Sequence, residues 1–220
     1  MAPAQTAVVL VSGGLDSCVA AAVAATRNEL AFLHASYGQR TSARELAAFE
    51  RIADHYGVGQ LMVADLGYLA RIGGSSLVDE TLPLPDHDEV DATLPSTYVP
   101  FRNANLLSAA VAWAEVIGAA QVYVGAHQAD SPYPDCDEAF FSAFNRVVEA
   151  GTGPDAHIAI LTPLLNLDKS GIVRLGVELE APLQLTWSCY RRQDEPCTRC
   201  HSCELRRLGF AGAGVDDPLL

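Results

Sequence analysis

The chain has 220 residues, of which half are apolar and 19% are charged, and its formal net charge at pH 7 is −13. This balance is typical of one medium-large globular domain with a buried core, and it excludes a disordered chain. The negative charge argues against a protein that holds nucleic acid by bulk electrostatics, so we expect no direct nucleic-acid partner.

The first part of the chain alternates between buried-strand and helix patterns. In order, these patterns predict a strand at residues 7–11, a helix at 16–26, a strand at 30–36, a helix at 41–56 and a strand at 60–65. Such alternation is typical of parallel strands joined by crossover helices. It therefore predicts an α/β fold, a parallel sheet with helices on both faces.

Residues 67–97 interrupt this alternation with a glycine pair, three prolines and a group of acidic residues. A stretch of this length inside a compact domain predicts a lid, a binding loop or a disordered segment. Regular patterns then resume with a helix at 103–117, a strand at 121–125, a helix at 136–150, a strand at 157–162 and a helix at 168–179. A short basic helix at 204–208 and a loose tail close the chain.

The hexapeptide Ser12-Gly13-Gly14-Leu15-Asp16-Ser17, the glycine loop, joins the first strand to the first helix. Glycines allow a tight turn and a close approach to a ligand, and a helix N-terminus offers unpaired amides at the positive end of its dipole. The loop lacks the lysine of a Walker motif and does not fit the dinucleotide fingerprint. It predicts a phosphate site held by backbone amides and serine hydroxyls; the alternative is an ordinary capped turn.

Four cysteines near the carboxyl end, Cys189, Cys197, Cys200 and Cys203, have the close spacing of metal ligands. Four thiolates suit one tetrahedral, structural Zn²⁺, with no position open for a catalytic water. An iron–sulfur cluster is the alternative, and the neighbouring His201 could replace one cysteine. Arginines flank the cluster, and they either solvate its surface or face an anionic ligand: Arg191, Arg192, Arg199, Arg206 and Arg207.

The glycine loop resembles the SGGxDS signature of the PP-loop ATP pyrophosphatases, which transfer AMP from ATP to an oxygen and release pyrophosphate. The resemblance implies an adenine-nucleotide alpha-hydrolase-like (Rossmann-like) fold and a Mg²⁺ ion near Asp16. It also implies an ATP site that comprises Leu10, Val11, Ser12, Gly13, Gly14, Leu15, Asp16, Ser17, Cys18 and Gln39.

Further motifs resemble one branch of that class, the 7-cyano-7-deazaguanine synthases. They are YGQR at 37–40, SxL at 75–77, VPxRN at 99–103, YPDC at 133–136, TPL with a later lysine at 162–173, and TWSCY at 186–190 with CxxCxxC. The resemblance extends from residue 8 to about residue 210. It implies an ATP- and ammonia-dependent ligase that converts 7-carboxy-7-deazaguanine to 7-cyano-7-deazaguanine through an amide, in queuosine precursor synthesis.

Within this interpretation we assign roles to individual side chains. Asp16, Lys169 and Arg102 are the expected catalytic residues, and the two cations would stabilise phosphate charge. The residues expected to hold the acceptor, by hydrogen bonds to a guanine-like edge or by stacking, are Asp130, Asp135, Tyr98 and Tyr133. The alternatives are that both aspartates are turn residues, that Tyr98 belongs to the core and that Lys169 is solvated.

The chain departs from the branch pattern at three places. Asp137-Glu138 replaces Arg-Pro, Phe101 replaces a small residue and Thr198 replaces a glycine. The first two departures motivate a rival, a related enzyme that stops at the amide or passes the activated deazaguanine to another acceptor. A rival of another class is a non-catalytic zinc-knuckle module that binds nucleic acid.

The expected organisation has three parts. Residues 1–185 form the ATP-binding α/β domain, 186–210 the four-cysteine zinc segment and 211–220 the tail. No basic segment precedes the first apolar run and no run approaches the roughly 20 residues that span a bilayer, so we expect a cytoplasmic protein with no membrane partner. The expected partners are small molecules, namely ATP, free ammonia and the deazaguanine acid, and the resemblance implies a homodimer.

Overall fold

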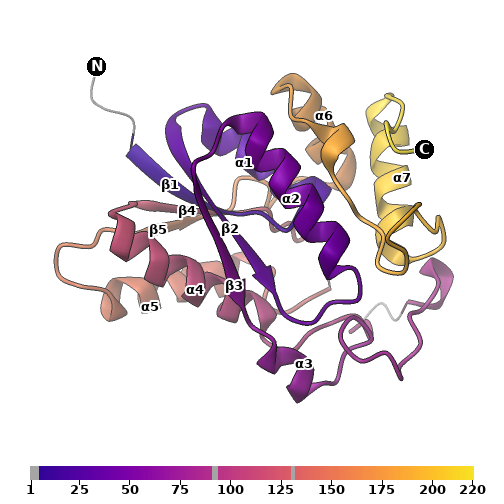
Figure 1. The fold of residues 1–220 in the computed structure, drawn as a ribbon, viewed down its shortest axis with the longest axis horizontal. Coiled ribbons are helices and arrows are strands. Elements are labelled where there is room, and N and C mark those ends of the chain that lie inside the picture. Colours follow the sequence, from indigo (N-terminus) through magenta and orange to yellow (C-terminus); the bar gives the residue numbers. More distant parts are fainter. Residues whose placement is uncertain (1–4, 91–93, 130–131) are drawn as a thin grey trace.

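The computed structural model describes residues 5–90, 94–129 and 132–220. Its centre is one parallel sheet with the strand order β3-β2-β1-β4-β5 (Figure 1). The strands are β1 (Gln5–Leu10), β2 (Asn28–Ser36), β3 (Gln60–Asp65), β4 (Gln121–Val124) and β5 (Ala159–Leu161). The predicted α/β fold with a parallel sheet is confirmed.

Helices cover both faces of this sheet (Figure 1). One face carries α1 (Leu15–Ala25), α2 (Ser42–Tyr56), α6 (Lys169–Glu178) and α7 (His201–Ala213). The other face carries α4 (Arg102–Ile117) and α5 (Glu138–Gly151). The short α3 (Tyr68–Ile72) and two 3-10 turns, His87–Glu89 and Leu183–Leu185, lie in the connections.

The central strand β1 explains why there are two cores. Its side chains alternate, so that Val9 packs with Phe32 and α1 on one face, while Val8 packs with Leu107 of α4 on the other. All four residues are completely buried. A strand that is apolar on both faces is stable only between two helix layers.

The last helix is longer than the sequence predicts. Two glycines, Gly209 and Gly212, break the helical pattern in the sequence, yet α7 runs through both. They lie where α7 crosses α6: a Cβ at Gly209 would be 2.5 Å from Cγ of Lys169, and one at Gly212 would be 2.1 Å from Oγ of Ser170. These glycines therefore permit close packing of two helices.

The carboxyl end is also more ordered than the expected loose tail. Arg206 donates from Nε and Nη2 to the two carboxylate oxygens of Asp217, at 2.7 and 2.8 Å. Both side chains are about 95% buried, with 4% and 5% exposed. A little further on, Leu219 packs against the cysteine segment. Such a bidentate pair is strong when water is excluded, and it ties the tail to α7.

The interrupting segment, residues 67–97, contains α3 and the 3-10 turn, and its described part is anchored from outside. The Arg40 guanidinium donates to the carbonyls of Ser76, Asp79 and Leu82, at 2.8, 2.8 and 2.5 Å. Leu77 and Val99 are buried in a small apolar cluster.

Among the described helices, none is long and apolar enough to cross a membrane.

His34 of β2 is a buried base, with 1% of its surface exposed. Its Nδ1 lies 3.1 Å from the Val11 carbonyl oxygen, and Nε2 has no hydrogen-bond partner in the described structure. Burial lowers the pKa of His34, although the Val11 carbonyl and the carboxylates of Glu45 and Glu50 act in the opposite direction. The folded state therefore holds His34 neutral at a pH where the unfolded chain binds a proton.

We expect stability to depend on pH through His34. Its contribution is complete above the unfolded pKa of about 6.5 and is lost as the pH falls toward the lower folded pKa. Urea unfolding between pH 7 and pH 5 should show a smaller loss of unfolding free energy in His34→Gln than in wild type, by on the order of 1 kcal/mol. Replacing the exposed His157 by Gln should leave the wild-type slope. Equal slopes for all three proteins would contradict a neutral buried His34.

Candidate active site

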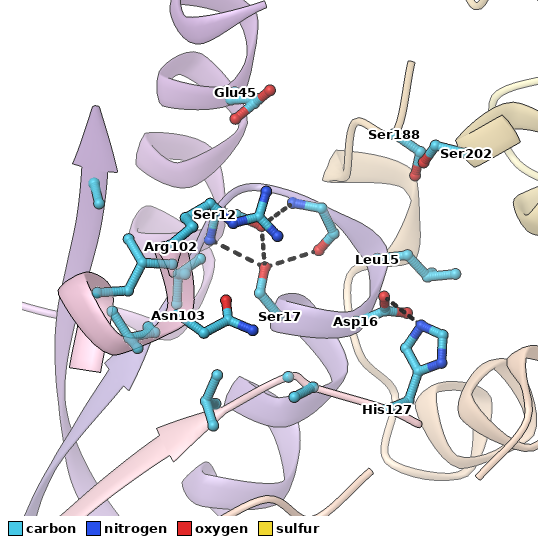
Figure 2. Close-up of a pocket in the computed structure, with 18 of the residues that line it drawn as sticks. Ser12, Leu15, Asp16, Ser17, Glu45, Arg102, Asn103, His127, Ser188 and Ser202 are labelled. Carbon is cyan, nitrogen blue, oxygen red and sulfur yellow. Dashed lines mark hydrogen bonds and ion pairs between the residues drawn. The ribbon is translucent and has the colours of Figure 1, made fainter. Parts of the chain in front are cut away.

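The glycine loop lies at the carboxyl edge of β1 and leads into α1 (Figure 2). The Ser17 hydroxyl is its hub: it accepts from the Ser12 N–H at 3.2 Å, donates to the Gly14 carbonyl at 3.0 Å and lies 3.1 Å from Oγ of Ser12. The Gly14 N–H in turn donates to the Ser12 hydroxyl. The loop thus folds around its own two hydroxyls at the start of a helix, the arrangement that suits an anion.

Two close approaches require glycine around this loop. Gly13 has a φ of +88°, and a Cβ there would lie 2.4 Å from the Glu45 carbonyl oxygen of α2. Gly125, directly after β4, faces the first turn of α1: a Cβ would lie 2.7 Å from the carbonyl carbon and oxygen of Asp16. Gly13 belongs to the predicted glycine loop, whereas no motif in the sequence marks Gly125, the residue that lets β4 end against the loop.

A compact charged cluster lies at the start of α1. Nζ of Lys169 donates to both carboxylate oxygens of Asp16, each at 2.8 Å, and lies 3.1 Å from Nε2 of His127. Nε2 of His127 is 3.5 Å from Oδ2 of Asp16, and a dashed line marks this contact in Figure 2. Burial alone would raise the pKa of Asp16, but the Lys169 charge and the His127 hydrogen bond together hold that pKa well below its usual value. Asp16 is therefore ionised at any physiological pH.

His127 is a site residue that sequence reasoning missed. It is 8% exposed and follows β4 by three residues, at the same edge as the glycine loop. No motif marks it; only its position after a strand of the sheet could have singled it out, because carboxyl ends of parallel strands share one edge.

One pocket of about 270 Å³ opens at this edge, beside the central pair β1 and β4. Of the expected ATP-site residues, those that line it are Leu10, Val11, Ser12, Gly14, Leu15, Asp16 and Ser17; Lys169 and Arg102 line it too. Gly13, Cys18 and Gln39 lie outside its lining. Cys18 belongs to the core, and the Gln39 side chain donates to the Glu45 carboxylate at 3.0 Å.

Arg102 begins α4 and reaches the pocket from the side opposite Asp16 and His127 (Figure 2). Its Nη1 donates to the Tyr37 hydroxyl at 3.2 Å, and the guanidinium lies 5.6 Å from the centre of the Tyr37 ring. Tyr133 and Tyr190 line the same pocket. Burial raises the pKa of Tyr37 and of Tyr133, so both stay neutral phenols near pH 7.

Two other residues expected at the acceptor, Asp135 and Tyr98, lie outside the pocket lining. The buried Asp135 accepts the Asn103 backbone N–H of α4 at 2.9 Å, so its carboxylate holds the start of that helix. Tyr98 packs on Tyr133, with ring centres 5.7 Å apart, and its hydroxyl accepts the Phe101 N–H. Asp130 lies outside the described residues.

The departures from the branch pattern also have structural explanations. The Asp137 carboxylate caps α5 by accepting the Phe140 N–H at 2.7 Å, and neither Asp137 nor Glu138 lines the pocket. Phe101 is 61% exposed and points its ring at Phe140. Thr198 has a φ of +56°, a conformation that glycine adopts more readily. The two acids therefore fit the positive end of a helix dipole.

The four cysteines come together as a possible metal site. Their Sγ atoms all lie within 4.8 Å of one another, and none is in a disulfide. Zn–S bonds of about 2.3 Å in a tetrahedron place sulfurs about 3.8 Å apart, and Sγ of Cys197 is 3.9 Å from that of Cys203. The backbone N–H groups of Arg191, Arg192 and Cys197 lie 3.4 Å from Sγ of Cys189. Donors of this kind stabilise thiolate ligands.

The arginines that flank the cysteines all have carboxylate partners within the chain. The pairs are Arg191 with Asp86, Arg199 with Asp86, Arg192 with Asp194, Arg206 with Asp217 and Arg207 with Glu204. Of these arginines, Arg206 alone belongs to the described lining of the pocket. The positive charge that the sequence concentrates near the cysteines is thus neutralised in the fold. This favours the interpretation that these arginines belong to the folded surface over the interpretation that they form a basic patch for nucleic acid.

The cysteine segment also forms one wall of the pocket. The Trp187 backbone N–H donates to the Gly13 carbonyl at 2.8 Å. Ser188 and Tyr190, on either side of Cys189, both line the pocket. Any ion bound by Cys189 would therefore fix the position of this wall.

The parallel sheet and the glycine loop define a nucleotide-binding α/β protein of the PP-loop class. A solved structure of NMN synthetase from Francisella tularensis has a similar fold, with a TM-score of 0.50 and 14% identity over 97% of this chain and 79% of that one.

The family model for the queuosine biosynthesis protein QueC matches residues 6–214, and the chain belongs to this family. It is 51% identical to a 7-cyano-7-deazaguanine synthase from Chlorobium phaeobacteroides, over 97% of this chain and 95% of the relative. It is 50% identical to a protein of the same name from Chlorobaculum tepidum, with the same two coverages.

The close approach at Gly125 gives a first test of the site. We expect Gly125→Ala to lower the unfolding free energy by about 2 kcal/mol, because the added methyl overlaps the backbone of Asp16. It should also weaken binding of an ATP analogue, because the loop must shift. Gly59→Ala is the matched control, since a Cβ there meets nothing within 4 Å. Urea unfolding and calorimetry measure both effects, and equal behaviour of the two variants would contradict the packing described.

Proposed function

We propose that the chain is a 7-cyano-7-deazaguanine synthase. It converts 7-carboxy-7-deazaguanine, ATP and ammonia into the nitrile, by way of the amide, in the synthesis of the queuosine precursor. The observation that carries this proposal is a single pocket, in a chain of this family, that joins the glycine loop to Asp16 and Lys169. The names of the relatives over nearly the full chain support the choice of substrate.

The chemistry proceeds in two activations. The substrate carboxylate attacks the α-phosphorus of ATP, and the bond between the α-phosphorus and the β-phosphate breaks. Pyrophosphate departs as the leaving group, and the product is an acyl adenylate. Ammonia then displaces AMP and loses a proton, which gives the amide. In the second round the amide oxygen is adenylated, and departure of AMP with that oxygen, together with loss of the nitrogen-bound protons, leaves the nitrile.

In this proposal the protein works by positioning and charge stabilisation. The amides and hydroxyls of the glycine loop hold the phosphates, and Lys169 stabilises the negative charge that develops on pyrophosphate. Asp16, ionised and at the pocket wall, is the expected ligand of Mg²⁺, which shields phosphate charge when bound. Tyr133 lines the pocket, which supports a role in stacking on the heterocycle; the roles of Tyr133, Tyr98, Asp130 and Asp135 all stay predictions.

Two features of the fold bear on the rival functions. The rival that stops at the amide was motivated by the two acids after the YPDC element, and the helix cap formed by Asp137 accounts for one of them without a substrate role. The rival nucleic-acid module needs free cations near the cysteines, whereas the arginines there have acidic partners. Both observations favour the synthase.

We further propose Zn²⁺ as the ion of the cysteine site, with a structural role. Residues 1–185 would then form the ATP-binding domain, 186–210 the zinc segment and 211–220 a tail. On the basis of the family resemblance, we also propose that the protein is a homodimer in the cytoplasm, without membrane or nucleic-acid partners. Sedimentation of the purified protein tests the oligomeric state.

The activity test follows AMP and product together. With 7-carboxy-7-deazaguanine, ATP and ammonia, we expect AMP release and, by mass spectrometry, the nitrile. Asp16→Asn should reduce AMP formation about 100-fold or more, because the phosphate end loses its carboxylate. Asp155→Asn, at an exposed position, is the control. A product that remains the amide at long times, or the release of ADP in place of AMP, would contradict the proposal.

A double variant separates folding from catalysis at this pair. Asp16→Asn alone leaves the buried Lys169 ammonium without its carboxylate and should lower stability by on the order of 2 kcal/mol. Adding Lys169→Met removes the stranded charge, so thermal unfolding should recover while AMP formation stays lost. Recovery of activity with stability would show that the pair is structural only.

The metal prediction uses two cysteines. Purified protein should contain about one zinc per chain, and Cys200→Ser should lose the metal and unfold at lower temperature, since metal binding contributes to folding. Cys18→Ser, at a buried cysteine of the core, should lose stability but keep the metal. Elemental analysis decides, and iron in place of zinc would overturn the assignment.

A further inference from the structure

Arg102 is a cation without a described counter-ion. None of the ion pairs in residues 5–90, 94–129 and 132–220 includes it. Its guanidinium is half-buried, lines the pocket and donates to the neutral Tyr37 phenol. A guanidinium stays charged at all accessible pH values, and a charge withdrawn from water without a partner is costly. The position therefore suits a ligand that brings a negative charge.

The surroundings of Arg102 differ from those of Lys169. At the Lys169 end lie the Asp16 carboxylate and His127. At the Arg102 end the pocket has phenol rings from three separate parts of the chain: Tyr37 after β2, Tyr133 after β4 and Tyr190 of the cysteine segment. Rings of this kind provide flat apolar walls with a polar tip, which suit a planar heterocycle better than a phosphate.

We propose that Arg102 binds the carboxylate of the acid substrate, with the heterocycle among the three tyrosines, rather than the phosphates of ATP. This inference rests on the proposed function and revises the role expected for Arg102 from the sequence. A planar guanidinium fork matches a carboxylate with two parallel hydrogen bonds. The glycine loop and Lys169 then bind the phosphates of ATP. The reacting oxygen of the substrate is held between the two ends of one pocket.

The proposal makes the two activations unequal. In the first round the group at Arg102 is a carboxylate, so the contact is an ion pair with hydrogen bonds. In the second round the group is a neutral amide, whose oxygen accepts a weaker hydrogen bond. A phosphate-binding arginine would serve both rounds equally, because ATP is the same in each.

The experiment compares acid and amide as separate substrates. In Arg102→Gln we expect the KM for 7-carboxy-7-deazaguanine to rise roughly 10- to 100-fold, and the KM for the corresponding amide to rise only about 3-fold. Calorimetry with a non-hydrolysable ATP analogue should give a Kd within about 2-fold of wild type. Arg102→Lys should rescue part of the acid binding. The exposed Arg146→Gln should behave as wild type.

Thermal unfolding provides a readout besides activity. Removing a cation that has no counter-ion among the described residues should leave the melting temperature of Arg102→Gln unchanged or raised, and the acid should stabilise wild type but not the variant. If the glutamine variant fails to fold, the unpaired-cation argument is wrong, and the lysine variant still reports the ratio of acid to amide binding.

The outcomes separate this inference from the proposed function. Equal losses with acid and amide, together with a Kd for the ATP analogue weakened at least about 10-fold, would assign Arg102 to phosphate and overturn the inference while the synthase stands. If wild type converts neither substrate and binds no acid, the proposed function fails and the inference fails with it.

Discussion

The ion pair between Asp16 and Lys169 is the contact on which the pocket depends. It joins the first turns of α1 and α6 across 153 residues of sequence. Lys169 is also the residue against which Gly209 lets α7 pack. The pair therefore fixes α6 and α7 at the edge of the sheet where the glycine loop opens. Because both charges are largely withdrawn from water, removal of either one alone would lower the free energy of unfolding.

A second wall of the pocket is built from two segments that are far apart in the sequence. Asp86, from the interrupting segment, pairs with Arg191 and Arg199 and forms an isolated antiparallel bridge with Cys200. Tyr190 packs in the same small apolar cluster as Leu77 and Val99. The cysteine segment, the interrupting segment and the tyrosine end of the pocket are therefore joined by direct contacts, so a metal held by the cysteines would also stabilise the interrupting segment.

What the sequence predicts well is what depends on local pattern. Strand periodicity and the glycine loop need only neighbouring residues, and cysteine spacing needs only a short segment. What it misses depends on tertiary contact. The helix through Gly209 is stable because α6 approaches closely there. Asp135 and Gln39 look like ligand residues, yet each bonds a partner inside the chain that the sequence does not reveal. His127 carries no motif and is defined only by the sheet edge.

Charge distribution links the fold to its ligands. A chain with a net charge of −13 should repel a nucleotide at most of its surface. Near the cysteines the arginines are paired with acidic residues, whereas the pocket contains the positive end of α1 and Arg102, which has no counter-ion among the described residues. Attraction is therefore confined to short-range donors inside the pocket. A site of this kind suits a small anion that can enter the pocket, because long-range attraction contributes little to binding there.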